Sequence, residues 1–524
     1  MENKETTKRI SRLHFLKTGG LLGGGMLILP VTDVLQLNDQ TMNGKLLING
    51  LPGFQLVIPV NASAIEKEAA QQLQHYLFEM SAIKLSIVEE GKHKDDTTIY
   101  IGNTNYTKAA GIDISQLKNE GIVLKPLSPN YIIAGGGEKG VLYAVYHLLE
   151  SIGFRKYTSG FTYIPKGNSI TLPSKEIAHT PFITYRTTSY RDTRDAEYTN
   201  WHKLSSSKSW GLFVHTFEKL VSPDEYGTSH PEYFSLIKES RQPGTQLCLS
   251  NPGVLDTLIL NLQKKMNEKP EAIYWSVSQN DNDQYCQCSE CTRLNDEYGG
   301  VRSGSIIYFV NQVAKQFPDK IISTLAYWYS RKAPKNIRVE PNVNIMLCNI
   351  ESRRQQPVFK TDPAFSNDLA DWGKLTGNIL IWDYNIQFTN LLSPFPNLHT
   401  IKPNIKFYTE NRVNALFMQA NSQAGGEMAG LRAYLISKLM YDPDADDNVI
   451  MDDYLNGYYG AAGTFIRQYI DSMRESLLKS EMQLDIFGDP NNAKDGYLSA
   501  EMMEHYKKLF DKAESLVANK PELL

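Results

Sequence analysis

The sequence lacks a concentration of charge of one sign. Its 54 Lys and Arg residues nearly balance 58 Asp and Glu residues, which gives a formal net charge of −4 over 524 residues. The basic residues are scattered and form no stripe of the kind that neutralises a phosphate backbone. This composition excludes nucleic acid as the expected partner.

Cysteine is also scarce, with five residues in the whole chain and none before Cys248. The absence of an early cysteine excludes a lipid-modified cysteine directly behind an export signal. Because five is an odd number, at least one thiol is free or bound to a metal.

Long apolar runs are missing as well. The apolar stretch Gly19–Pro30 follows several Lys and Arg residues and is too short to cross a bilayer easily. This pattern predicts a signal peptide over residues 1–31 and no membrane anchor. Ser11–Lys17 resembles a twin-arginine motif except at Leu13, so we expect a periplasmic or extracellular protein exported by a Sec or a degenerate twin-arginine signal.

The pattern of apolar residues predicts an α/β protein in three parts. Strand-like and helical segments alternate over residues 44–175, which predicts a small α/β sandwich domain. Residues 180–442 repeat a strand and a helix in eight units, as a (β/α)8 TIM barrel requires. The predicted barrel strands are Ile183–Tyr190, Gly211–His215, Thr245–Leu249, Ala272–Ser278, Lys320–Ala326, Val343–Cys348, Asn378–Asp383 and Ala415–Gln419.

Helices are predicted between the barrel strands and throughout residues 445–524. They include Pro252–Lys265, Ser303–Gln316, Pro363–Leu375, Glu427–Met440, Val449–Gly457, Gly463–Ser480 and Ala500–Ala518. The chain ends at Leu524 without the Gly or Pro that usually closes a domain, so a truncated C-terminal region is one interpretation.

The fourth predicted strand is followed by two features of chemical interest. Asn280 and Asp281 come first, and the cluster Cys286, Cys288 and Cys291 comes next. These cysteines could form a disulfide, which the expected exported location favours. They could also bind a structural zinc ion with Cys248 as a fourth ligand. Either interpretation makes the cluster structural, and no catalytic metal or other cofactor is predicted.

Carboxylates, amides and aromatic rings gather at the predicted strand ends, where barrel enzymes carry their chemistry. Hydroxyl groups of a sugar pair with amides and carboxylates, and its apolar face packs on Trp and Tyr, so these residue types favour a glycan ligand. Cleavage of a glycosidic bond requires a carboxylic acid and a second supporting group. The candidate catalytic residues are Asp281, Asp383, Glu351 and Glu427, and the candidate substrate-binding residues are His215, Asn280, Tyr327, Trp328, Trp382, Tyr384 and Gln419.

Several candidates have an equally simple structural explanation. Asp281 could form an Asx turn, and Glu351 could pair with a following arginine. Glu427 could stabilise a helix N-terminus, and His215 could be a core histidine.

A family resemblance rests on many short motifs between residues 185 and 460. They include His215–Phe217, His230–Phe234, Leu247–Pro252, Ser276–Asn282 with the cysteine cluster, Leu325–Tyr327, Trp382–Tyr384, Pro394–Asn397 and Leu431–Leu435. This region resembles a large family of exported bacterial proteins, long labelled a domain of unknown function and related to glycoside hydrolase family 163. Residues 44–175 resemble the small domain that precedes the barrel in β-hexosaminidases and α-glucuronidases.

The resemblance implies an exported glycoside hydrolase that cleaves β-linked N-acetylhexosamine in complex glycans of oligosaccharides or glycoproteins. The acetamido group of the substrate would then be the nucleophile, with Asp281 as the acid and Asp383 as the partner carboxylate. Two alternatives stay open. One is an α-glucuronidase-like hydrolase, in which His215, Arg191 or Arg353 binds the sugar carboxylate. The other is a noncatalytic glycan-binding protein, because Met418 stands where many relatives are expected to carry Glu.

Overall fold

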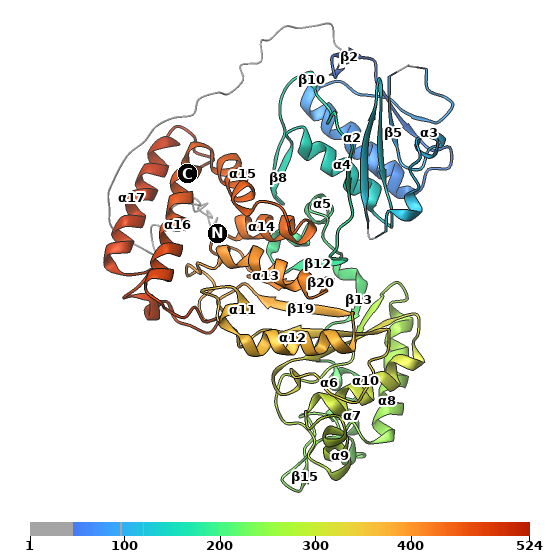
Figure 1. Ribbon diagram of the computed structural model, residues 1–524, viewed down its shortest axis with the longest axis vertical. Helices are drawn as coiled ribbons and strands as arrows, with labels where there is room; N and C mark the ends of the chain where they lie inside the picture. The colour runs from blue at the N-terminus through green and yellow to red at the C-terminus, as the bar shows by residue number, and fades with distance from the viewer. Residues whose placement is uncertain (1–45, 95–96, 119) are drawn as a thin grey trace, which may run out of the picture.

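The computed structural model describes residues 46–94, 97–118 and 120–524. The predicted signal peptide over residues 1–31 lies outside them. No helix in these ranges is long and apolar enough to cross a membrane. Figure 1 shows an N-terminal α/β domain, a central parallel sheet with its helices, and a group of C-terminal helices.

The N-terminal domain is built on a six-stranded mixed sheet in the order β11-β6-β7-β5-β3-β4. Its strands are β3 (Gln55–Ile58), β4 (Ile87–Glu89), β5 (Thr98–Ile101), β6 (Ile122–Leu127), β7 (Asn130–Gly135) and β11 (Ile177–His179). Helices α2 (Ala64–Ser81) and α4 (Gly140–Ser151) cover one face, and α3 (Asn105–Ala109) lies on the other (Figure 1). Helix α2 begins where the sequence predicts, because Ser63 caps it in a capping box with Glu66. The smaller strands of this region are β1 (Leu47–Ile48), β2 (Leu51–Pro52), β8 (Arg155–Thr158), β9 (Phe161–Tyr163) and β10 (Ser169–Ile170).

The central sheet contains seven parallel strands in the order β12-β20-β19-β18-β17-β16-β13. They are β12 (Tyr185–Thr188), β13 (Trp210–Leu212), β16 (Tyr274–Ser276), β17 (Ile321–Ala326), β18 (Val343–Cys348), β19 (Ile379–Tyr384) and β20 (Ala415–Gln419). The intervening helices are α5 (Ala196–Trp201), α6 (Phe217–Leu220), α7 (Pro223–Tyr226), α8 (Pro252–Glu268), α9 (Ser289–Glu297), α10 (Ser303–Gln316), α11 (Val358–Thr361), α12 (Pro363–Leu375), α13 (Leu398–Glu410) and α14 (Ala429–Tyr441).

The sheet curls like a barrel, but the predicted eight-stranded ladder is not complete. The edge strands β12 and β13 are joined through side chains, because Trp210 Nε1 donates a hydrogen bond to the Tyr185 hydroxyl over 2.8 Å. The predicted third strand, Thr245–Leu249, does not enter the sheet, and β13 pairs directly with β16. Leu247 forms only an isolated bridge with Phe234, beside the hairpin of β14 (Leu236–Ile237) and β15 (Ser240–Arg241).

Hydrogen bonds of Gln246, which lies within Thr245–Leu249, explain why this segment does not join the sheet. Gln246 uses its side-chain amide, rather than a backbone ladder, to bind the segment that follows β16. Its Oε1 accepts from Asn280 N over 2.9 Å, and its Nε2 donates to the carbonyl oxygens of Asn280 and Asn282, each over 2.8 Å. Thr245–Leu249 is therefore a turn that is attached to the sheet through the Gln246 side chain.

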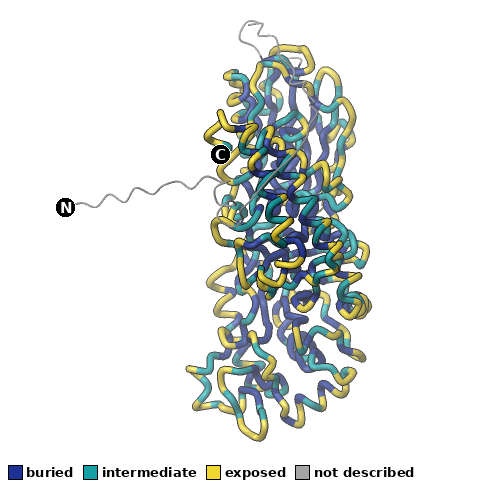
Figure 2. The backbone as a smooth tube through the Cα atoms, turned by 90° about the vertical axis from the view of Figure 1, so that its left-hand side faces the viewer, coloured by how far each residue is buried: buried dark blue, intermediate teal, exposed yellow. Residues whose placement is uncertain are grey.

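The C-terminal helices share the hydrophobic core of the central sheet. They are α15 (Asp447–Tyr459), α16 (Gly463–Lys479) and α17 (Ala500–Leu516), close to the predicted ranges. Buried residues run along the interior of the elongated molecule in Figure 2. The loop between α16 and α17 returns to the sheet, where Leu484 O accepts from Arg354 N and Ile486 O accepts from Phe388 N.

A buried ion pair joins the N-terminal domain to the central sheet. Glu150 of α4 accepts from Lys203 Nζ over 3.0 Å, from Lys438 Nζ and from Trp201 Nε1. Burial alone would raise the pKa of Glu150, but the two lysines outweigh that effect and hold the pKa well below its ordinary value. The domain contact therefore includes an ionised carboxylate with little access to water.

Candidate functional site

A cavity of about 400 Å³ opens at the carboxyl ends of strands β17 to β20. Because side chains alternate along a strand, the lining residues that belong to strands lie on one face of the sheet, and loop residues complete the lining. The lining residues are His215, Asp281, Leu325, Tyr327, Trp328, Cys348, Ile350, Trp382, Tyr384, Phe388, Gln419 and Phe487. Seven of these were predicted as site residues from the sequence, so the strand-end argument located the cavity.

Aromatic rings dominate the wall of this cavity. Trp382 and Tyr384 are stacked with centroids 5.6 Å apart, and Tyr327 and Trp328 are stacked with centroids 5.0 Å apart. Trp328 is 45% exposed, so one of its faces is available to a ligand. Trp382 Nε1 donates to Gln419 Oε1 over 2.8 Å, which fixes the Trp382 ring and the Gln419 amide relative to each other. This wall offers flat apolar surfaces with polar atoms at their edges.

Asp281 is the only carboxylate among the described residues that line the cavity. The Tyr327 hydroxyl donates to its Oδ1 over 3.2 Å, so Oδ2 is the oxygen left for a ligand. Burial raises the pKa of Tyr327 well above its usual value, and the charge of Asp281 adds to the shift. Tyr327 is therefore a protonated donor throughout the physiological pH range.

His215 is held in a strained backbone conformation at the cavity edge. Its φ is +52°, in the left-handed region that non-glycine residues rarely adopt. Ser278 Oγ accepts from its backbone N over 3.0 Å, and Gln279 O lies 2.9 Å from its Nδ1. Because a carbonyl oxygen can only accept, Nδ1 carries the proton, and neutral His215 has Nε2 as an acceptor. Trp328 also has a positive φ of 49°, and such strain is often found at functional sites.

Asn280 does not line the cavity, although it precedes Asp281 directly. Its Nδ2 donates to Thr245 O over 2.7 Å, and its Oδ1 accepts from Glu218 N over 3.2 Å. Together with Gln246, these bonds hold the backbone on both sides of Asp281. Asn280 and Gln246 are therefore placed to position Asp281, and the sequence pattern contained no signal for Gln246.

Replacing Gln246 by alanine should remove the hydrogen bonds that hold the turn carrying Asp281. The change leaves the buried Asn280 N–H and carbonyl without their partner, which should lower the free energy of unfolding by about 1–3 kcal/mol. Hydrogen exchange of the Asn280 amide should accelerate, because its acceptor is Gln246 Oε1. Gln263→Ala is the matched control, since that glutamine is exposed on α8. Equal exchange in both variants would contradict this role.

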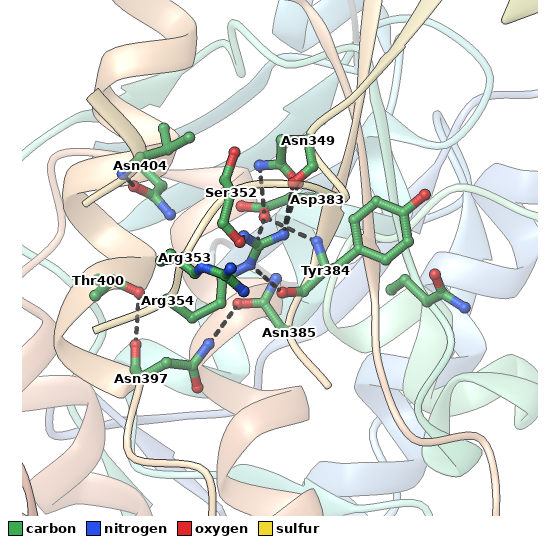
Figure 3. A network of polar contacts seen from close by, with 12 residues as sticks. Asn349, Ser352, Arg353, Arg354, Asp383, Tyr384, Asn385, Asn397, Thr400 and Asn404 are labelled. Carbon is green, nitrogen blue, oxygen red and sulfur yellow. Dashed lines mark hydrogen bonds and ion pairs between the residues drawn. The ribbon is translucent and has the colours of Figure 1, made fainter. Parts of the chain in front are cut away.

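Asp383, the predicted partner carboxylate, faces away from the cavity. It stands between Trp382 and Tyr384, both of which line the cavity, so strand alternation directs it to the opposite face. Its oxygens accept from Asn349 Nδ2 over 2.9 Å and from the Tyr408 hydroxyl over 3.0 Å. Figure 3 shows the part of this network around Asn349 and Asp383, in which Arg354 donates to Asn349 and to the Tyr384 carbonyl. Its catalytic assignment stays a prediction, and the contacts describe a buried anchor of the β18–α11 loop.

The other predicted carboxylates also lie outside the lining. Glu351 is exposed and pairs with Arg331 over 3.1 Å. Glu427 is buried against Arg432 at 2.8 Å and borders a separate small cavity next to α15 and α16. Glu351 is thus in an ion pair, as one interpretation had it, but with the preceding Arg331 and not with a following arginine. For Glu427, whose structural interpretation was stabilisation of a helix N-terminus, the structure shows an ion pair with Arg432.

Several lining residues were not predicted, for different reasons. Leu325 and Cys348 lie on the same strand face as Tyr327 and Trp382, so alternation could have identified them. Phe388 and Phe487 stack on each other with centroids 5.6 Å apart. No local signal connects Phe487, in the loop before α17, with strands more than a hundred residues earlier.

These features define an α/β protein with a curled parallel sheet and an aromatic cavity at the carboxyl ends of its strands. Residues 156–471 match the family model described as a domain of unknown function, DUF4838, and the chain belongs to that family. Residues 53–148 match the model for the N-terminus of glycosyl hydrolase family 67. No curated protein matches the chain.

Three solved structures are similar to the chain at low identity. The first is a family GH138 enzyme targeting pectin rhamnogalacturonan II, with 13% identity and a TM-score of 0.43; the match covers 82% of this chain and 56% of that one. CpGH84D has 11% identity and a TM-score of 0.47, with coverage of 89% and 81%. A β-N-acetylhexosaminidase from Bacteroides fragilis has 11% identity and a TM-score of 0.46, with coverage of 82% and 93%. The chain thus spans little more than half the length of the GH138 enzyme.

Proposed function

We propose that this protein is a glycoside hydrolase that cleaves β-linked N-acetylhexosamine in complex glycans. The observation that carries the proposal is the cavity itself: its described lining combines stacked aromatic rings with a single carboxylate and a single histidine. Aromatic faces bind the apolar face of a pyranose, and the carboxylate, histidine and amide bind its hydroxyl groups. The match of residues 53–148 to a glycosyl hydrolase N-terminus supports the same class.

The number of carboxylates favours a mechanism in which the substrate supplies its own nucleophile. Most glycosidases use two carboxyl groups that flank the scissile bond, whereas substrate-assisted enzymes are an exception. Asp281 alone reaches the cavity among the described carboxylates that were candidates. In the proposed reaction, the 2-acetamido oxygen attacks the anomeric carbon while Asp281 protonates the departing oxygen. Water then opens the resulting oxazolinium intermediate and returns the proton to Asp281.

The lining argues against a uronic acid as the substrate. A sugar carboxylate calls for a cationic partner, but none of the described lining residues is Lys or Arg. Arg353 forms an ion pair with Asp485, and Arg191 is exposed outside the cavity. An α-glucuronidase-like activity would depend on His215 alone for charge recognition.

A noncatalytic glycan-binding protein remains the second candidate, because one carboxylate is also compatible with binding alone. Met418 no longer adds to that case. It is fully buried, pairs in register with Asp383, and alternates with Gln419, which lines the cavity. Strand geometry therefore directs residue 418 away from the ligand.

The discriminating experiment compares three substrates with the purified protein. We expect release of sugar from a glycoprotein that carries complex N-glycans or from a chromogenic β-N-acetylglucosaminide, and no release from a chromogenic α-glucuronide. Calorimetric titration with the released glycan measures binding independently. Turnover of the glucuronide alone would replace the proposal by the uronic acid alternative, and binding without turnover would support the glycan-binding alternative.

A further inference from the structure

Four cysteines converge near the segment that carries Asp281: Cys248 comes from one part of the sequence, and Cys286, Cys288 and Cys291 come from another. The Sγ atoms of Cys248, Cys286, Cys288 and Cys291 all lie within 4.8 Å of one another. Cys248 Sγ is 3.7 Å from Cys288 Sγ and 4.0 Å from Cys291 Sγ. Zinc–sulfur bonds of about 2.3 Å place the corners of a tetrahedron roughly 3.8 Å apart. The two separations from Cys248 are close to the edges of such a site, and the other pairs lie within 4.8 Å.

Local structure explains how the sulfur atoms reach this arrangement. Cys248 belongs to the turn that replaces the predicted third strand, so the departure from barrel geometry brings it to the cluster. Cys288 is the N-cap of α9, and its Sγ accepts from Cys291 N over 3.5 Å. The positive end of this helix thus faces the sulfur atoms, which favours their charged form.

Further donors surround the sulfur atoms. Leu236 N donates to Cys286 Sγ over 3.3 Å, and Ser250 Oγ lies 3.2 Å from Cys291 Sγ. The Arg241 guanidinium lies 3.9 Å from Cys286 Sγ. Outer donors of this kind orient metal ligands and offset their negative charge. Buried thiols that only fill space would not need so many polar neighbours.

We propose that Cys248, Cys286, Cys288 and Cys291 bind one zinc ion in a tetrahedral tetrathiolate site. On binding, the four thiols lose their protons to solvent, four Zn–S bonds form, and no atom changes its oxidation state. A disulfide instead needs a separation of about 2.0 Å and an acceptor for two electrons. Four protein ligands leave no open position on the metal, so this zinc stabilises structure and does not contact substrate.

The site braces the turn that carries Asp281. Cys248 lies two residues from Gln246, whose amide holds the backbone of Asn280 and Asn282. Cys286 lies five residues after Asp281, in the segment that carries Asp281. Zinc therefore holds this segment directly through Cys286 and indirectly through the turn that contains Cys248 and Gln246. The inference about the metal does not depend on the reaction that the cavity performs.

The first test measures metal and thiols in the full chain, purified without chelators. We expect about one equivalent of zinc by plasma mass spectrometry. In the denatured protein, one thiol should react before a chelator is added, and the other four should react once the chelator has removed the zinc. Cobalt exchanged into the site should show the intense thiolate-to-metal absorption and tetrahedral bands of a sulfur-ligated ion. Metal-free protein with five reactive thiols, protein with disulfides by non-reducing mass spectrometry, or an iron-loaded site would each overturn the zinc assignment.

The second test uses matched cysteine variants. Cys248→Ser should lose the zinc, whereas Cys348→Ser should keep it, because Cys348 is buried on β18 away from the cluster. Cys291→His supplies another zinc ligand and should retain metal if Cys248→Ser fails to fold. A mercurial reagent that reacts with the thiols of the wild-type protein should release zinc, which a zinc-binding dye detects. The treated protein should also have a lower melting temperature. Retention of zinc by Cys248→Ser would overturn the site.

Discussion

Replacing Asp281 by asparagine should lower turnover by about 10²- to 10⁴-fold, the usual contribution of a general acid, on a β-N-acetylglucosaminide that the wild-type protein hydrolyses. The amide keeps the size of the side chain and can still accept from the Tyr327 hydroxyl at 3.2 Å, so the cavity should keep its shape. The loss should appear in kcat, with little change in the affinity for the product glycan. Steady-state kinetics together with calorimetric titration separate these two effects.

A matched control lies two residues away. Asp283 is exposed in the same turn and does not line the cavity, so Asp283→Asn should keep wild-type turnover. A substrate with a good leaving group needs less help from an acid, and the Asp281→Asn defect should shrink on an activated aryl glycoside. Equal turnover by Asp281→Asn and wild type on the natural glycan would remove Asp281 from the proposed mechanism.

The sequence predicted much of the fold because its helices carry local boundary signals. Helix α12 begins at Pro363 as expected, since Asp362 caps it and proline suits the first turn. Helix α10 spans Ser303–Gln316, as its apolar periodicity predicts. The segment Thr245–Leu249 shows the limit of this approach. Its Leu247 and Leu249 are buried as in a strand, but Gln246 and Cys248 contact partners 34 and 40 residues further along the chain, outside the sheet.

The site was predictable where one strand positions a residue and unpredictable where several segments must meet. Tyr327, Trp382 and Gln419 follow from the rule that function gathers at strand ends. Applied strictly, two-residue alternation also indicates that Asp383 cannot face the cavity together with Trp382 and Tyr384. Phe487 lies beyond such reasoning, because contacts between distant segments bring it to the cavity: its ring stacks on Phe388, and its neighbour Ile486 accepts from Phe388 N.

Replacing Glu150 by glutamine should destabilise the protein by about 3–5 kcal/mol, the usual effect of removing one partner of a buried ion pair. Glu150 is only 14% exposed and faces Lys203, which is 3% exposed, so the lysine would stay buried without a countercharge. Denaturant unfolding followed by tryptophan fluorescence measures the change. The control is Glu176→Gln, which removes a pair with Lys125 at 3.2 Å whose carboxylate is 48% exposed. That change should cost less than about 1 kcal/mol.

The dependence of this defect on pH identifies its cause. The pKa of Glu150 is lowered in the folded protein, so its stabilising contribution is present above its ordinary pKa and is lost as pH falls through the lowered value. Acidification should therefore narrow the gap between wild type and Glu150→Gln. Burial lowers the pKa of Lys203 to about 8, against the opposing charge of Glu150. Between about pH 8 and the ordinary pKa of lysine, the unfolded chain binds more protons than the folded protein, so the free energy of unfolding rises with pH. In Glu150→Gln this rise should begin at lower pH, because the charge that opposes the effect of burial on Lys203 is gone. A gap that stays constant from acid to alkaline pH would mean that lost packing, and not an uncompensated lysine, causes the destabilisation.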